Sequence, residues 1–212
     1  MNLKELKLIC KAGEGQFVEF KMNANQPSQI AEEVVGFANA KGGSLFVGVD
    51  DNGTPCGLKF VEDDAIFLTD YINQVIEPPP LFNYEIIPLT KARAILHFII
   101  NSGHEKPYGI KETSKTKKVF YRVDDLCIQA SRELKNILRR TRQNIGLTIK
   151  YTELEDRILK LIERDNSLSK TQICQMTNFS ARKISDCLIR LVTAGVLKII
   201  PSVNDDLYEY HR

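Results

Sequence analysis

The sequence offers few residues for a metal site or a disulfide framework. Its five cysteines include no C-x-x-C pair, and its three histidines lie far apart along the 212 residues. An odd set of unpaired cysteines argues against both a structural zinc site and a disulfide-stapled fold. The cysteines are therefore expected to stay reduced.

Long apolar runs are also missing. No run approaches the roughly 20 residues that cross a bilayer. The N-terminal stretch MNLKELKLICKAGEGQFVEF has charges among its apolar residues, so it lacks the continuous apolar segment of a secretory signal. Together with reduced cysteines, these features predict a cytoplasmic protein with no membrane partner.

A surplus of one charge is absent as well. The 29 lysines and arginines nearly balance the 27 aspartates and glutamates, which leaves a formal net charge of +2. Such a weak overall field permits a nucleic-acid partner without arguing for one, so the case must rest on where the charges lie. The length and a hydrophobic content of 43% allow two domains.

The first part of the chain alternates helical and strand-like patterns, which predicts a mixed α/β domain over residues 1–140. A strand over residues 16–21 would place Glu19 and Lys21 on the same face. Ser28 can cap a helix that ends before the pair Gly42 and Gly43. Helices are further expected over residues 3–10, 65–76 and 131–140, and strands over residues 44–49, 84–89, 94–100 and 119–123.

Residues 151–212 carry the pattern of a winged helix-turn-helix domain, joined to the first domain by a linker over residues 141–150. Apolar residues at helical spacing mark three helices, and two short strands flank a turn over residues 202–206. The predicted fold class is therefore α+β, with a C-terminal winged helix.

The third helix of this domain carries its polar residues on one side. Buried positions force Arg182, Lys183, Asp186 and Arg190 outward, and a recognition helix places its first outward residues in the major groove of DNA. Arg182 and Lys183 are the preferred contacts, with Arg190 behind them. Alternatively, the domain is a packing module for dimerisation, because ten basic residues barely exceed nine acidic ones from Lys150 onward.

Three motifs in the first domain resemble the Schlafen-type AlbA-like domain over roughly residues 10–140. They are EGQFVEFK from Glu14, FANAKGGSLFVGVDDNG from Phe37 and VFYRV from Val119. In bacteria this domain is commonly fused to a helix-turn-helix in proteins described as transcriptional regulators. The resemblance therefore implies a DNA-binding regulator, and two-fold half-sites imply a homodimer.

The same resemblance implies a rival activity. Eukaryotic relatives cleave RNA with a metal-binding carboxylate triad, and the matching positions here are Glu14, Glu19 and Asp51. Mg²⁺ or Mn²⁺ would take these oxygen ligands, and Lys21 could hold a phosphate. The residues alone also allow Glu19 to pair with Lys21 or another basic residue and Asp51 to shape a turn. A non-catalytic protein-interaction scaffold is the third possibility.

Other basic residues could follow a phosphate backbone, with Tyr108 or Tyr121 stacking on unpaired bases. This interpretation covers Lys117 and Lys118 in a lysine-rich loop that also holds Lys106, Lys111 and Lys115, together with Arg122, Arg139 and Arg140. The alternatives are a solubilising surface and, for Arg122, pairing with a carboxylate. No GxxxxGK[ST] loop is present, so ATP is not expected as a cofactor.

Overall fold

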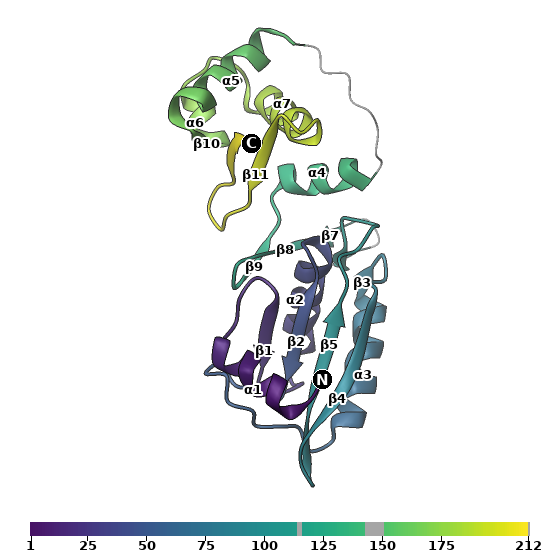
Figure 1. Ribbon diagram of the computed structural model, residues 1–212. Coiled ribbons are helices and arrows are strands. Elements are labelled where there is room, and N and C mark those ends of the chain that lie inside the picture. The colour runs from purple at the N-terminus through teal and green to yellow at the C-terminus, as the bar shows by residue number, and fades with distance from the viewer. Residues whose placement is uncertain (114–115, 143–150, 212) are drawn as a thin grey trace. The chain divides into compact units, whose positions relative to one another are not determined.

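The computed structural model describes residues 1–113, 116–142 and 151–211. The chain divides into two compact units, Met1–Gln129 and Ala130–Arg212 (Figure 1). Each unit has its own hydrophobic core and is described by itself. No helix within the described ranges is both long enough and apolar enough to cross a membrane.

The first unit is built on a four-stranded sheet in the order β1-β2-β5-β4. β1 runs parallel to β2, and the other neighbours are antiparallel. Its strands are β1 (Val18–Lys21), β2 (Gly43–Val47), β4 (Phe82–Thr90) and β5 (Arg93–Ile100). The helices are α1 (Leu3–Ala12), α2 (Pro27–Asn39) and α3 (Val61–Val75). These elements confirm the expected mixed α/β domain.

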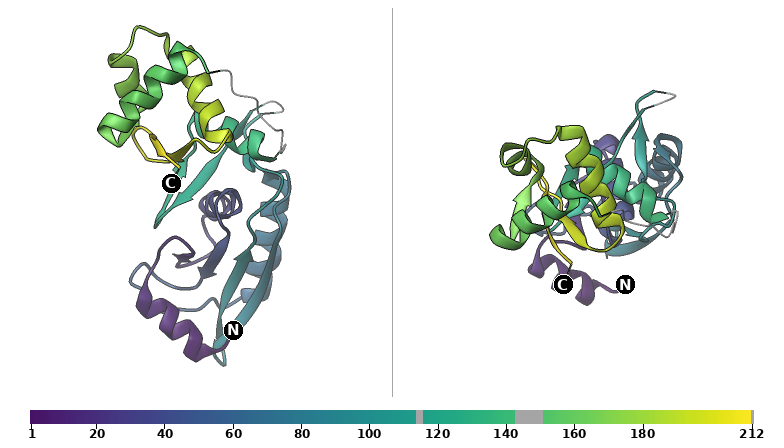
Figure 2. Two further views of the ribbon diagram at one scale, coloured as in Figure 1. Left: turned by 45° about the horizontal axis from the view of Figure 1, so that its top comes forward. Right: turned by 90° about the horizontal axis from the view of Figure 1, so that it is seen from above.

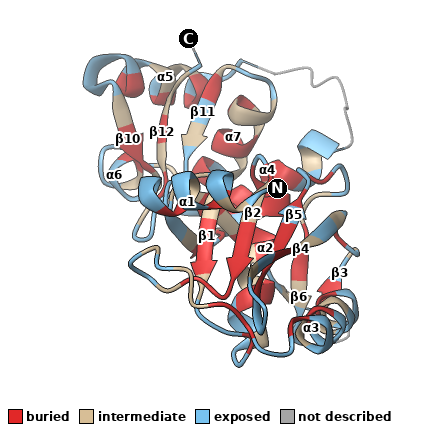
Figure 3. Ribbon diagram, turned by 60° about the horizontal axis from the view of Figure 1, so that its bottom comes forward, coloured by how far each residue is buried: buried red, intermediate tan, exposed pale blue. Residues whose placement is uncertain are grey.

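Strand β2 is buried on both faces, as its nearly continuous apolar sequence predicts. Leu45 and Val47 pack in the larger core with α2 and α3, whereas Phe46 packs in a smaller core with α1. Figure 3 shows most of β2 in the colour of buried residues. Because successive side chains of a strand point to opposite faces, β2 contributes to both cores. α1 covers one face of the sheet, and α2 and α3 cover the other.

Gly42 lets the chain turn sharply between α2 and β2. Its φ of 80° lies in the left-handed region, and a Cβ at this position would lie 2.6 Å from the carbonyl oxygen of Ile100. Only glycine meets both requirements without strain. The geometry of this turn therefore explains why the first residue after Lys41 in the KGG motif is glycine.

A hairpin of β8 (Phe120–Val123) and β9 (Leu126–Gln129) packs against α2. A Cβ on Gly36 of α2 would lie 2.6 Å from Sγ of Cys127, so the missing side chain permits the close approach. A separate three-stranded sheet consists of β3 (Ile76–Glu77), β6 (Gly109–Lys111) and β7 (Lys117–Lys118). The sequence predicted β8 but not β9.

The second unit contains four described helices and a small antiparallel sheet in the order β10-β12-β11. Its elements are coloured from green to yellow in Figure 2. The helices are α4 (Arg132–Arg142), α5 (Glu153–Asp165), α6 (Lys170–Gln175) and α7 (Ala181–Thr193). The strands are β10 (Ser167–Ser169), β11 (Leu197–Ile200) and β12 (Leu207–Tyr210). The core of α5, α6 and α7 includes Ile158, Ile173 and Leu188.

Helix α4 belongs with the second unit, although the sequence placed it at the end of the first domain. It buries Leu134, Ile137 and Leu138, and its Glu133 accepts a hydrogen bond from Ser185 of α7. The helix extends to Arg142, two residues into the linker expected over residues 141–150. Residues 143–150 of that linker lie outside the described residues.

Candidate functional site

A buried cluster of charges joins β1, α2 and the β8–β9 hairpin. Nη1 of Arg122 lies 2.7 Å from Oε2 of Glu19 and 2.8 Å from Oε2 of Glu33. Lys21 pairs with Oε1 of Glu19 and lies 3.5 Å from Oε1 of Glu33. The two cations therefore face two carboxylates inside the protein.

Arg122 is a structural residue and does not reach the surface. Its side chain is fully buried, and its guanidinium lies 5.0 Å from the centre of the Phe37 ring. Nη2 donates hydrogen bonds to the carbonyl oxygens of Gly15 and Val18. The expectation that Arg122 binds nucleic acid is thus wrong, because carboxylates and carbonyl oxygens inside the fold occupy its donors.

The cluster also affects ionisation. Burial, followed by repulsion from Glu19, raises the pKa of Glu33 to about 7, despite the nearby charges of Lys21 and Arg122. Burial opposes the charge of Lys21, but its hydrogen bond to Glu19 and the charge of that carboxylate outweigh burial and raise the pKa of Lys21. Lys21 therefore stays cationic, with its charge matched internally instead of facing solvent alone.

The carboxylate triad that the family resemblance implies is not assembled. Both oxygens of Glu19 are engaged, one by Lys21 and one by Arg122. Oε1 of Glu14 accepts a hydrogen bond of 2.8 Å from the backbone N–H of Phe20, and burial raises the pKa of Glu14. Among the described residues, no group of three or more His, Cys, Asp or Glu side chains is placed to hold a metal ion. As they lie, Glu14, Glu19 and Asp51 do not fit Mg²⁺ or Mn²⁺.

Asp51 is exposed and lines a small cavity of about 240 Å³ together with Lys21, Asn23 and Gln29. The turn after β2 is held by the neighbouring aspartate instead. Oδ1 of Asp50 accepts hydrogen bonds from the backbone N–H groups of Asn52 and Thr54, at 3.0 and 2.7 Å. The turn-shaping role that the sequence suggested for Asp51 thus falls to Asp50.

The FAN motif has a structural explanation that sequence reasoning missed. Asn39 is buried, and its Nδ2 donates to the carbonyl oxygens of Tyr108 and Phe120 at 2.9 and 2.8 Å. Its Oδ1 accepts from the backbone N–H of Tyr108 at 2.8 Å. Tyr108 itself is buried, so it cannot stack on a base as expected.

The lysine-rich loop is less available than its composition suggests. Lys117 lies 3.6 Å from Oε2 of Glu77, and Lys118 lies 3.3 Å from Oε1 of Glu112. Nζ of Lys106 donates to the carbonyl oxygen of Ala40 at 2.7 Å. Lys115 lies outside the described residues. Lys117 and Lys118 remain partly exposed, but exposed ion pairs of this kind compensate much of their charge.

A second feature that the sequence did not reveal is a hydrogen-bond chain across β2, β5 and β4. Nε2 of His97 lies 2.9 Å from Oγ of Ser44, and Nδ1 lies 2.9 Å from Oε1 of Glu85. Burial lowers the pKa of His97, whose ring stacks on Phe46 at 4.1 Å. The backbone N–H of Ser44 donates to the carbonyl oxygen of Phe17, just before β1, so this N–H is not free to stabilise an oxyanion. These hydrogen bonds therefore serve to connect strands β2, β5 and β4.

In the second unit, Arg182 and Lys183 lie exposed in the first turn of α7. Oγ of Ser180 caps this turn by accepting a hydrogen bond from the backbone N–H of Lys183. Neither cation forms an ion pair with any residue that the structure describes. Both charges are therefore available to a ligand.

Arg190 plays a different part from the one expected. It pairs with Glu155 of α5, a buried residue that also accepts a hydrogen bond from Thr152. Burial opposes ionisation of Glu155, but the hydrogen bonds from Thr152 and Arg190 outweigh burial and lower its pKa to about 2. Arg190 thus holds α5 against α7, which reduces its availability for DNA.

The remaining basic residues of the prediction lie on α4. Arg139 is exposed and donates a hydrogen bond of 3.3 Å to Oδ1 of Asn136, whereas Arg140 is half-buried. Since α4 packs on α7, both arginines belong to the same unit as Arg182 and Lys183.

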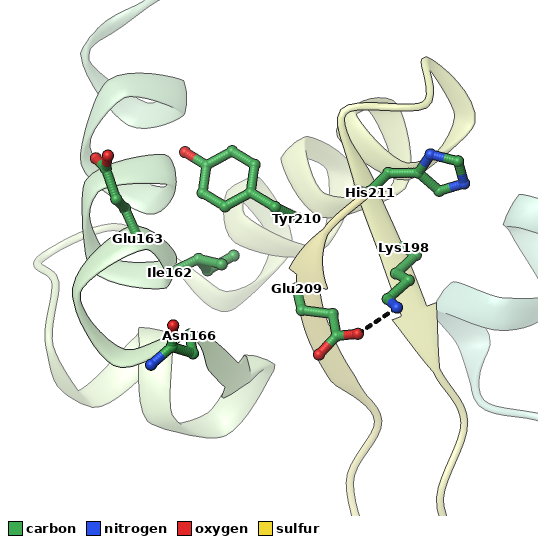
Figure 4. Close-up of a pocket in the computed structure, with 7 residues that line it drawn as sticks. All are labelled: Ile162, Glu163, Asn166, Lys198, Glu209, Tyr210 and His211. Atoms are coloured by element: carbon green, nitrogen blue, oxygen red, sulfur yellow. Dashed lines mark ion pairs between the residues drawn. The ribbon is translucent and has the colours of Figure 1, made fainter.

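A cavity of about 740 Å³ opens between α5 and the sheet of the second unit (Figure 4). Lys198 and Glu209 point toward each other across β11 and β12 and form an ion pair. The Tyr210 hydroxyl donates to the carbonyl oxygen of Leu159. The ion pair between Lys198 and Glu209 partly neutralises the charged lining of the cavity. The cavity is lined by Ile162, Glu163, Asn166, Lys198, Glu209, Tyr210 and His211.

Comparison with known families identifies the first unit. Residues 14–131 match the family described as Schlafen, AlbA_2. The match covers more than half of the 212 residues, so the chain belongs to this family, as the three sequence motifs indicated. The match ends two residues past the first unit and leaves all of α4 outside.

Two solved structures are similar to parts of the chain. One is the DIP2311 protein from Corynebacterium diphtheriae, with 16% identity over 92% of this chain and 34% of that protein, and a TM-score of 0.47. This chain therefore spans about a third of that protein. The other is the N-terminal domain of a "Putative ATP-dependent DNA Helicase RecG-related Protein" from Nitrosomonas europaea, with 19% identity over 72% of this chain and 99% of that domain, and a TM-score of 0.46. No curated protein matched the sequence.

Proposed function

We propose that this protein is a cytoplasmic DNA-binding regulator whose second unit is a winged helix, with α7 as the recognition helix. The observation that carries the proposal is the pair Arg182 and Lys183. Both side chains are exposed on the first turn of α7, and neither is paired with a carboxylate of a described residue. A recognition helix uses this turn to contact base edges in the major groove.

The order of elements supports a winged helix. The helices α5, α6 and α7 share one core, and the strands β11 and β12 follow α7 as an antiparallel pair. The short helix α6 and the turn before Ala181 match a helix-turn-helix. In this arrangement β11, β12 and the turn between them form the wing.

The acidic residues of the wing are engaged within the unit. Asp206 is buried and accepts hydrogen bonds from Ser131 and from the backbone N–H of Ser202. Oδ2 of Asp205 accepts from the backbone N–H of Thr171 at 3.3 Å. These carboxylates stabilise the turn of the wing and the start of α6, so they are compatible with DNA bound at α7.

The first unit has a supporting role in this proposal, as a dimerisation or sensing domain that adds weaker nucleic-acid affinity. Its charges at Glu19, Lys21 and Arg122 are matched internally, which leaves little for a phosphate. Half-sites of duplex DNA favour a two-fold homodimer. RNA cleavage is not proposed, because the carboxylates it would need are not gathered.

Selection from a random duplex library tests the proposed function. The full chain is expected to enrich a subset of sequences, since base contacts by a recognition helix discriminate by about 1–3 kcal/mol each. The variant Arg182→Ala with Lys183→Ala is expected to lose this enrichment. A matched control replaces Arg157 and Lys160, an exposed pair on α5, with alanine. Enrichment that survives in the α7 variant would contradict the proposal.

A further inference from the structure

Helix α4 carries a basic face that is directed to solvent. Arg132, Lys135 and Arg139 recur at the i, i+3, i+7 spacing that brings side chains onto one face of a helix. The opposite face is buried and consists of Glu133, Leu134, Ile137 and Leu138. The side chains of Arg132 and Arg139 are exposed, and Lys135 is half-buried.

No acidic side chain of α4 offsets these charges. Glu133 is the only carboxylate in the helix, and it is buried, with Oε1 accepting from Ser185 at 2.6 Å and from Lys170 at 3.0 Å. Neither Arg132 nor Lys135 forms an ion pair within the described part of the chain. The basic face therefore presents uncompensated charge to solvent.

The buried face of α4 anchors the helix on α7, so the basic face points away from this contact and into solvent. Glu133 contacts Ser185, and Ser185 follows Arg182 by three residues on α7, so these two side chains are neighbours on the helix surface. The first turn of α4 therefore lies beside the second turn of α7. Both belong to one compact unit, so their spacing is fixed by packing.

We propose that Arg132, Lys135 and Arg139 of α4 bind backbone phosphates of the same duplex whose groove receives α7. The inference rests on the proposed function and extends it to a second contact surface. From Arg132 to Arg139 the helix rises about 10 Å, which matches the rise of about three base pairs. Three cations over this span suit phosphates within one short stretch of a single strand, and such contacts carry no sequence information.

The test compares two charge-reversal variants of the full chain with matched geometry. One is Arg132→Glu, Lys135→Glu and Arg139→Glu. The control is Lys4→Glu, Lys7→Glu and Lys11→Glu on α1, which has the same i, i+3, i+7 spacing, the same change in net charge and three exposed side chains. Fluorescence anisotropy with a mixed-sequence duplex, repeated over a range of salt concentrations, measures the affinity of each.

The α4 variant is expected to bind the duplex about tenfold or more weakly. The magnitude of its slope of log K against log salt is expected to decrease by about 2–3, because each phosphate contact contributes about 0.9 to that slope. The control is expected to stay within about twofold of the natural chain. Wild-type binding by the α4 variant, or an equal loss in the control, would overturn the proposal. If the α4 variant fails to fold by circular dichroism, the milder Arg132→Gln, Lys135→Gln and Arg139→Gln variant decides by the same criterion.

The outcomes separate this inference from the proposed function. In one outcome the α4 variant loses affinity, whereas the Arg182→Ala and Lys183→Ala variant keeps its sequence enrichment. This outcome would support the phosphate contact by α4 and contradict the groove contact by α7. If the α4 variant binds normally and the α7 variant loses its enrichment, only the groove contact by α7 is supported. A natural chain that binds no duplex would overturn both.

Discussion

The hydroxyl of Ser185 on α7 donates a buried hydrogen bond of 2.6 Å to the carboxylate of Glu133 on α4. Burial opposes ionisation of Glu133, but hydrogen bonds from Ser185 and Lys170 outweigh burial and lower its pKa. The carboxylate therefore stays ionised inside the unit. This contact makes α4 part of the same structure as the proposed recognition helix.

The segment 130–212 is expected to unfold cooperatively and to be more stable than the segment 151–212. Ile189 is buried and lies one turn after Ser185 on the same face of α7, so removal of α4 is expected to expose it. Ser185 and Lys170 would also lose their partner Glu133. Exposing one such apolar side chain costs about 1.5–3 kcal/mol, so a difference of at least that size is expected. Urea unfolding followed by circular dichroism measures it. Equal stability of the two segments would show that α4 is not part of the unit.

Replacing Arg122 with alanine is expected to destabilise the first unit by about 3–5 kcal/mol, because Glu19 and Glu33 would be left as buried charges without this partner. Thermal or urea unfolding measures the loss. Arg139→Ala, at an exposed position, serves as the control and is expected to change stability by less than about 0.5 kcal/mol. A similarly small effect of Arg122→Ala would contradict the structural role.

Stability is expected to fall as pH rises from about 4.5 to about 7 through the contribution of Glu33. Its pKa is raised to about 7 in the folded protein, so over this range the folded state binds more protons than the unfolded state. The free energy of unfolding is expected to decrease by about 1–3 kcal/mol, and the decrease is complete above the pKa of Glu33 in the folded protein. Glu33→Gln removes this dependence.

The comparison of Glu33→Gln with the natural chain isolates this residue, because His97 acts with the opposite sign. Burial lowers the pKa of His97, so its contribution to stability is full above about 6.5 and is lost as pH falls. Urea unfolding at several pH values gives the difference curve. A curve that is flat from pH 5 to 7.5 would contradict the assignment to Glu33.

Gly42→Ala is expected to destabilise the first unit by more than Gly13→Ala. Both glycines have positive φ values, 80° and 85°, which cost about 1–3 kcal/mol for other residues. Only at Gly42 would the added Cβ also meet backbone, at 2.6 Å from the carbonyl oxygen of Ile100, whereas none of the atoms around Gly13 lies within 4 Å. Equal losses in melting temperature would show that the close approach has no consequence.

Local patterns predicted the first unit well because its elements carry strong local signals. The apolar run of β2 and the period of α2 lie within single stretches of sequence, and three motifs identified the family. The partners of Arg122 could not be predicted in the same way. Glu19 and Glu33 lie far from it along the chain, and only the fold brings them together.

The position of α4 shows the same limit at the level of domains. The sequence shows an amphipathic helix with one acidic residue, Glu133, but nothing local states which unit its apolar face will cover. A composition change after Arg140 looked like a linker, whereas the decisive contact is with Ser185, more than forty residues later. For α7, by contrast, the buried positions were enough to predict that Arg182 and Lys183 face outward.

The affinity of the full chain for duplex DNA at physiological salt tests the central claim most directly. Anisotropy titrations would compare the natural chain, Arg182→Ala with Lys183→Ala, and the control Arg157→Ala with Lys160→Ala on a duplex recovered by selection. The α7 variant is expected to bind about tenfold or more weakly, while the control stays within about twofold. Equal binding by all three proteins would contradict the claim that α7 contacts DNA.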